Sequence, residues 1–111
     1  MRTSLVYSVL KDDVWDSKKG CYVKKITSRG FDFYVSGAKS ESEHVKVVEN
    51  FYDYLTSCGF SANFFGNGTW EENLRYNDTK SFEFLSIPVD DTWSKEEIES
   101  LYKTWKKQYK G

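Results

Sequence analysis

The sequence is poor in the residues that build common catalytic and metal sites. Its 111 residues include one His, two Cys and one Pro. One His excludes paired-histidine phosphoesterase sites and most zinc sites, because these need several His or Cys ligands. Cys21 and Cys58 are far apart and form no C-x-x-C motif, so we expect two buried thiols and no disulfide. We therefore predict a protein that is not an enzyme and has neither cofactor nor bound metal.

A nucleophilic cysteine is the one catalytic arrangement that this inventory leaves open. Cys21 begins an expected strand, and His44 could serve as its base if the fold brought the two together. Cys58 lies on the apolar face of an expected helix, which favours a place in the core. His44 belongs to the first turn of that helix, so we expect it to be solvated or to cap the helix.

The chain also lacks a dominant charge and a long apolar run. Its net charge is −1, from 16 basic and 17 acidic side chains, so no global field draws it to nucleic acid or to a membrane. Serines and charges interrupt the apolar stretch near the N-terminus, which predicts neither a signal-peptide core nor a membrane span. We expect a cytoplasmic protein that folds as a single domain over residues 1–111.

Aromatic residues are abundant instead, at 4 Trp, 8 Tyr and 8 Phe. One interpretation is a small aromatic core with Tyr hydroxyls at its rim. The other is that some rings reach the surface, where Trp and Tyr are favoured in protein interfaces.

Two amphipathic helices are predicted at about residues 40–58 and 95–109. Ser40 with Glu43, and Ser94 with Glu97, have the spacing of capping boxes that start helices. Gly59 can end the first helix in a left-handed conformation. Apolar residues then recur at helical spacing: Val48, Phe51, Tyr52, Leu55 and Cys58 in the first helix, and Ile98, Leu101, Tyr102, Trp105 and Tyr109 in the second.

The strands are less sharply marked. We predict a strand at residues 3–10, a polar loop at 11–20 that carries Trp15, and a hairpin with arms 21–27 and 31–36 that turns at 28–30. Further strands are expected at 60–65 and 81–87. Residues 69–76 fit a short helix or the return arm of a hairpin, and we favour the strand. The fold class is α+β, a mostly antiparallel sheet with both helices packed on one face.

These exclusions favour a small module that binds another protein through exposed aromatics. The expected contact residues are Trp15, Tyr54, Trp70 and Tyr109, since buried Trp and Tyr dominate interface energies. Small cytoplasmic domains of this kind often act as inhibitors or as immunity or anti-defence factors that occlude their partner, and a mobile element or phage is the expected source. The alternative is a nucleic-acid-binding module on the hairpin at 21–36, using Lys24, Lys25, Arg29, Tyr22 and Tyr34.

Overall fold

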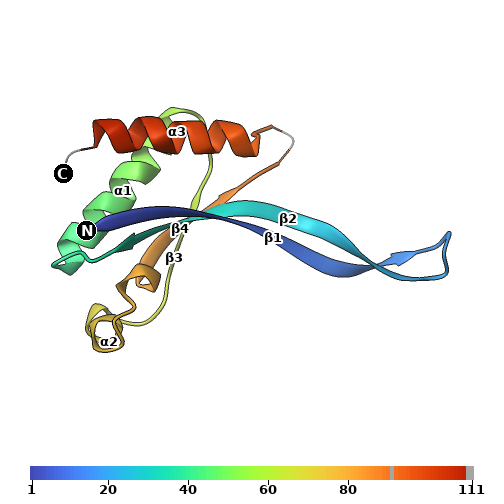
Figure 1. Ribbon diagram of the computed structural model, residues 1–111, viewed down its shortest axis with the longest axis horizontal. Helices are drawn as coiled ribbons and strands as arrows, with labels where there is room; N and C mark the ends of the chain where they lie inside the picture. Colours follow the sequence, from blue (N-terminus) through green and yellow to red (C-terminus); the bar gives the residue numbers. More distant parts are fainter. Residues whose placement is uncertain (91, 110–111) are drawn as a thin grey trace.

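The computed structural model describes residues 1–90 and 92–109. Within them the elements follow in the order β1 (Arg2–Asp16), β2 (Cys21–Ser36), α1 (Glu41–Ser57), β3 (Asn63–Gly66), α2 (Trp70–Arg75), the 3-10 helix η1 (Thr79–Ser81), β4 (Glu83–Pro88) and α3 (Lys95–Gln108). The strands form one antiparallel sheet in the order β1-β2-β4-β3 (Figure 1). The predicted α+β class is confirmed.

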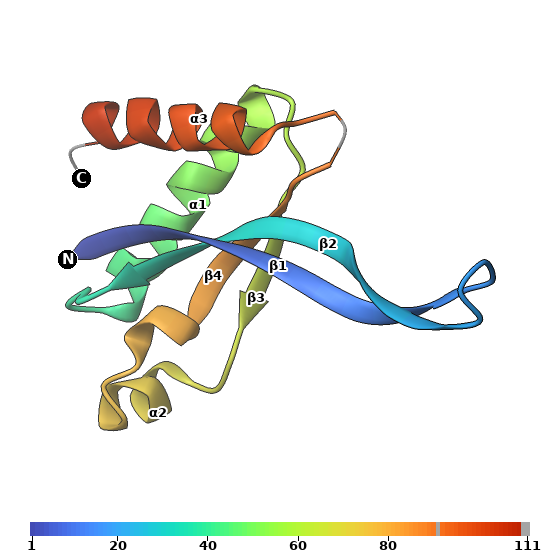
Figure 2. The same cartoon turned by 45° about the vertical axis from the view of Figure 1, so that its right-hand side comes forward.

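Both long helices pack on the same face of the sheet. Alternate residues of β2 and β4 turn toward them and are buried: Phe31, Phe33, Val35, Leu85 and Ile87. Phe33 is at the centre of this core, where its ring stacks on Phe51 of α1 at 4.4 Å and meets the edge of Trp105 of α3 at 5.5 Å. Figure 2 shows α3 crossing α1. The Trp105 indole N–H ties the two helices together by donating to Asn50 Oδ1 at 2.8 Å.

The helix boundaries follow the sequence signals closely. The Ser40 hydroxyl accepts a hydrogen bond from the Glu43 backbone N–H at 3.1 Å, and Ser94 accepts one from Glu97 at 3.2 Å. Each bond satisfies a donor that the first helical turn leaves free. Gly59 takes φ +90 after the end of α1, as its place beyond the last apolar residue predicts.

The predicted loop at 11–20 and the predicted turn at 28–30 are both wrong. β1 continues to Asp16 and β2 begins at Cys21, so the hairpin turns at residues 17–20. The polar residues that suggested a loop instead pair across the two strands, as in the 3.4 Å ion pair between Lys24 Nζ and Asp13 Oδ1. Gly30 lies inside β2, opposite Ser8 and Pro88, because only a residue without a Cβ fits there.

The preferred strand at 69–76 is wrong as well. These residues form α2, which begins with a complete capping box: Thr69 Oγ1 accepts from the Glu72 N–H at 3.2 Å, and Glu72 Oε2 accepts from the Thr69 N–H at 3.1 Å. Asn73 is buried and its amide donates to Asn67 O and to Thr69 O, each at 2.7 Å. These bonds hold the preceding turn against the helix. The neighbouring strands, expected at 60–65 and 81–87, form at Asn63–Gly66 and Glu83–Pro88.

His44 is fully buried and not solvated as expected. Its Nε2 lies 2.8 Å from the backbone oxygen of Glu83 on β4, and its ring meets the edges of Trp70 and Phe82. Burial lowers the pKa of the His44 imidazole, and the bond to Glu83 partly opposes that effect. His44 lies four residues before Val48, on the face of α1 that packs into the core. This position buries His44 even though it belongs to the first turn of the helix.

Replacing Gly30 by Ala should destabilise the fold. A Cβ at this position would lie 2.9 Å from the Ile87 backbone oxygen. β4 would therefore have to shift at the end of its pairing with β2. We expect a loss of about 1–3 kcal/mol in the free energy of unfolding, measured by urea denaturation. Ser28→Ala on the same strand is the control and should stay within about 0.5 kcal/mol of the wild type. An unchanged midpoint for Gly30→Ala would contradict this packing.

Candidate protein-binding surface on the β1–β2 arm

The outer part of the β1–β2 hairpin projects from the rest of the molecule. β4 pairs with β2 only from Gly30 to Phe33, so residues 9–28 form a ribbon of two strands without a third. We call these residues the arm. Figure 1 shows it extending away from the helices, along the longest dimension of a molecule that measures 55 Å by 33 Å by 16 Å. A ribbon of this kind has both faces open to a partner.

One face of the arm carries an exposed aromatic pair. Trp15 lies opposite Tyr22, and the two rings meet edge to face with centroids 5.2 Å apart. Trp15 is 55% exposed and Tyr22 67% exposed. Next along the same face come the Asp13–Lys24 ion pair and then Lys11 opposite Ile26. The pair is therefore preorganised near the end of the arm, flanked by charges.

The other face of the arm is smaller and partly apolar. Val14 pairs with Val23, and both are half-buried. Thr27 is the extra residue at a bulge beside Leu10, and its hydroxyl donates to Asp12 Oδ2 at 2.6 Å. Leu10 is 57% exposed. An isolated two-stranded ribbon is marginally stable in water, and this one leaves the Leu10 side chain open to solvent.

The residues predicted for protein binding fall in three different places. Trp15 is on the arm, in a strand and not in the expected loop. Tyr54 and Tyr109 line one shallow hollow between α1 and α3, where the Tyr109 ring stacks on Trp105 at 5.0 Å. Trp70 packs in the core with 9% of its surface exposed, so it is not available as an anchor. Only Tyr54 and Tyr109 are brought together.

The sequence interpretation missed Leu10 and Ile26, and placed Tyr22 only in the alternative set. The signal that could have found them is the continued alternation of residues 9–16 and 21–26 on either side of a D-S-K-K-G turn. The charged residues at 11–13 interrupt the alternation of apolar and polar residues. They can stand there because neither face of an exposed ribbon has to be apolar.

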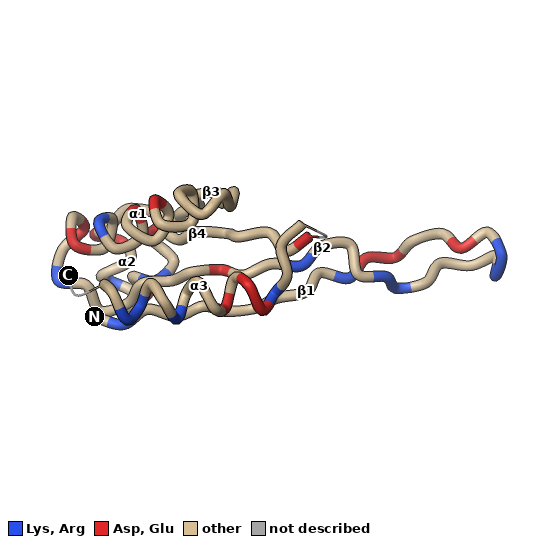
Figure 3. The backbone as a smooth tube through the Cα atoms, turned by 90° about the horizontal axis from the view of Figure 1, so that it is seen from above, with Lys and Arg blue, Asp and Glu red and all other residues tan. Residues whose placement is uncertain are grey.

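The residues of the nucleic-acid alternative do not line one groove. Tyr22 and Lys24 share a face of the arm, while Lys25 pairs with Asp12 on the opposite face. Tyr34 lies in the body, beside Phe84 at 5.0 Å, where burial and then Asp32 raise the pKa of its hydroxyl. The arm carries five Lys and three Asp, and Figure 3 shows blue and red segments along it.

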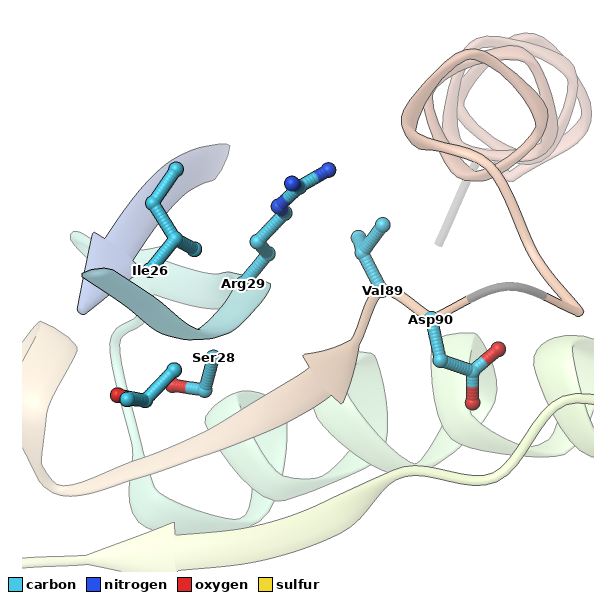
Figure 4. A pocket seen from close by; sticks show the side chains of 6 residues that line it. Ile26, Ser28, Arg29, Val89 and Asp90 are labelled. Atoms are coloured by element: carbon cyan, nitrogen blue, oxygen red, sulfur yellow. The ribbon is translucent and has the colours of Figure 1, made fainter. Parts of the chain in front are cut away.

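A polar hollow marks the base of the arm. Residues 26–29 form one wall, with Val89 and Asp90 opposite. The Val89 N–H donates to Arg29 O at 2.9 Å, which fixes the chain after β4 against the ribbon. The side chains of Arg29 and Asp90 point away from each other (Figure 4). We interpret this hollow as a structural feature of the junction between the arm and the body, and not as a binding site.

The structure does not assemble the catalytic pair considered from the sequence. Cys21 is not buried as expected but exposed, because it lies at the outer end of the arm, whereas His44 is buried between α1 and β4. In the described residues no group of three or more His, Cys, Asp or Glu could hold a metal ion. Among the described helices, none has the length and apolar character needed to cross a membrane.

Comparison with known proteins adds no assignment. No family model matches the sequence, and neither the curated proteins nor the solved structures contain a detectable match.

Glu83 is an unfavourably placed acid near the surface of the body. It borders a hollow between α1 and β3, and its Oε2 is buried without a hydrogen-bond partner in the described part of the chain. Burial raises the pKa of the Glu83 carboxyl, and the carboxylates of Glu49 and Glu41 raise it further. The unfolded chain therefore ionises this group at lower pH than the folded protein does, so ionisation disfavours folding as the pH rises.

Glu83→Gln should stabilise the protein at pH 7 by less than about 1 kcal/mol, since the carboxylate stays partly solvated. The gain should shrink as the pH falls and vanish below the ordinary Glu pKa of about 4.3, where both states are protonated. Thermal unfolding from pH 3 to pH 8 measures this. Glu71→Gln, at an exposed acid in the first turn of α2, is the control and should show no such gain. A gain for Glu83→Gln that persists at pH 3 would refute the electrostatic cause.

Proposed function

We propose that this protein is a binding module that binds a partner protein through its arm. The observation that carries the proposal is the Trp15–Tyr22 pair, which is preformed and exposed near the end of a ribbon. Aromatic residues with few rotatable bonds bind at low entropic cost and are frequent hot spots. A thin ribbon can enter a cleft that a globular surface cannot reach.

Occlusion is the mode of action that this shape supports. The arm holds the aromatic pair away from the helices, so the partner's cleft would be filled by the ribbon and covered by the body behind it. An inhibitor, or an immunity or anti-defence factor, acts by steric block of this kind and needs no catalytic group. The hollow with Tyr54 and Tyr109 is our candidate for a secondary contact of the body.

The arrangement of charge favours a protein partner over nucleic acid. Lys24 is neutralised by Asp13 at 3.4 Å, and Lys25 has Asp12 directly across the ribbon. Phosphate binding gains its energy from the release of counterions by unpaired basic groups. The arm's net charge of about +2, from five Lys and three Asp, is small for such a role.

Trp15→Ala and Tyr22→Ala should each strongly weaken capture of the partner. The purified protein is used as bait in host lysate, with washes at low and high salt and with or without nuclease. We expect one retained protein that survives both treatments, and a loss of affinity of about 30-fold or more for each variant. Tyr76→Ala, at a residue that is 75% exposed beside α2, is the matched control and should bind as the wild type does.

Two outcomes would overturn this proposal. Retention that disappears with nuclease or salt would favour nucleic acid and the lysines of the arm. Capture that survives in Trp15→Ala and Tyr22→Ala but fails in Tyr54→Ala would move the binding surface to the helices.

A further inference from the structure

The outer edge of β1 is free where the strand runs along the arm. β1 is at the end of the strand order, so no other described strand pairs with its outer side. α3 contacts the half of β1 that belongs to the body, where the Tyr102 hydroxyl lies 2.9 Å from Thr3 Oγ1 and Lys95 Nζ lies over the Tyr7 ring. Beyond Tyr7 the edge presents unpaired backbone groups, which are a template for another strand.

The geometry of the edge favours pairing. The bulge at the Leu10/Lys11 step places its extra residue, Thr27, in β2 and not in β1. β1 is therefore an uninterrupted strand of 15 residues, whereas proteins that protect an edge usually shorten or break it. The charged side chains on this stretch are the remaining obstacle to pairing with another strand. They no longer oppose pairing if one register places opposite charges across from each other.

A second copy of β1 satisfies these charges in one register. In a two-fold symmetric antiparallel pair, a residue on the axis faces its own counterpart and the flanking residues pair symmetrically. With Asp12 on the axis, Lys11 faces Asp13, Leu10 faces Val14 and Val9 faces Trp15. An axis at Lys11 would pair Leu10 with Asp12, and an axis at Asp13 would pair Lys11 with Trp15. Only the Asp12 axis matches cation with anion and apolar with apolar.

We infer that β1 pairs with β1 of a second copy, antiparallel about Asp12, and joins two sheets into one. The facing Asp12 carboxylates are the cost of this register, and each is already held by the Thr27 hydroxyl at 2.6 Å. Pairing uses backbone groups in the plane of the ribbon, so the Trp15–Tyr22 faces stay open. The inference goes beyond the proposed function and is measured without any partner protein.

A disulfide tests the register directly. Residues that face each other in an antiparallel pair have Cα atoms about 4.5–5.5 Å apart, within the range that a disulfide spans. In a Cys21→Ser, Cys58→Ala background, Asp12→Cys should cross-link to a covalent dimer under mild oxidation. Leu10→Cys is the control and should cross-link at least about tenfold more slowly, because its predicted counterpart is Val14. Equal rates for the two variants, or none for Asp12→Cys, would overturn the inference.

Charge variants test the same contact without a covalent bond. Sedimentation equilibrium should show a concentration-dependent dimer for the wild type. Lys11→Glu and Asp13→Lys should each weaken it by about tenfold or more, because each places like charges opposite one another at two symmetric sites. An equal mixture of the two variants should dimerise again, since the carboxylate introduced at position 11 of one chain then faces the ammonium group introduced at position 13 of the other. A wild type that remains monomeric, or a mixture that remains dissociated, would show that β1 does not pair in this way; circular dichroism checks that each variant is folded.

Discussion

The fold depends on the burial of Phe33 between the sheet and both long helices. Its ring is fully buried, stacked on Phe51 and edge-on to Trp105. Phe33 belongs to β2, the strand that pairs with both β1 and β4. The Phe33 side chain therefore holds the sheet against the helices. It also fixes the inner half of the hairpin, from which the arm projects. Large buried aromatics of this kind contribute about 3–5 kcal/mol each.

This anchoring explains how an exposed ribbon keeps its shape. A hairpin alone pays the whole entropy of chain ordering and gains little burial. Here the inner half is fixed by β4 and the helices, so the arm extends an existing ladder. Cross-strand pairs such as Asp13 with Lys24 and Trp15 with Tyr22 then add small increments along it. A preordered arm loses less entropy when it binds than a flexible loop would.

Local signals in the sequence predicted the local structure, and tertiary contacts decided the rest. The caps at Ser40 and Ser94 and the apolar stripes of α1 and α3 were predictable because their partners lie within a few residues. Gly30 suggested a turn, yet it is a close approach to Ile87 on a strand far away in the sequence. α2 depended on the bonds of buried Asn73. The candidate binding surface depended on which aromatic rings the fold leaves exposed: Trp15 is exposed and Trp70 is not.

The proposed contacts of the arm with a partner protein and with a second copy would use different parts of the ribbon. Its faces carry side chains, with Trp15 beside Tyr22 on one and Leu10 on the other, while its outer edge carries backbone donors and acceptors. A partner protein that covers a face leaves the edge free, and a strand that joins the edge leaves the faces free. Pairing about Asp12 would also set Val9 of one copy beside Trp15 of the other, and so would enlarge the apolar surface offered to a partner. Self-association and target binding would then reinforce each other, because the dimer presents two aromatic pairs on one rigid sheet.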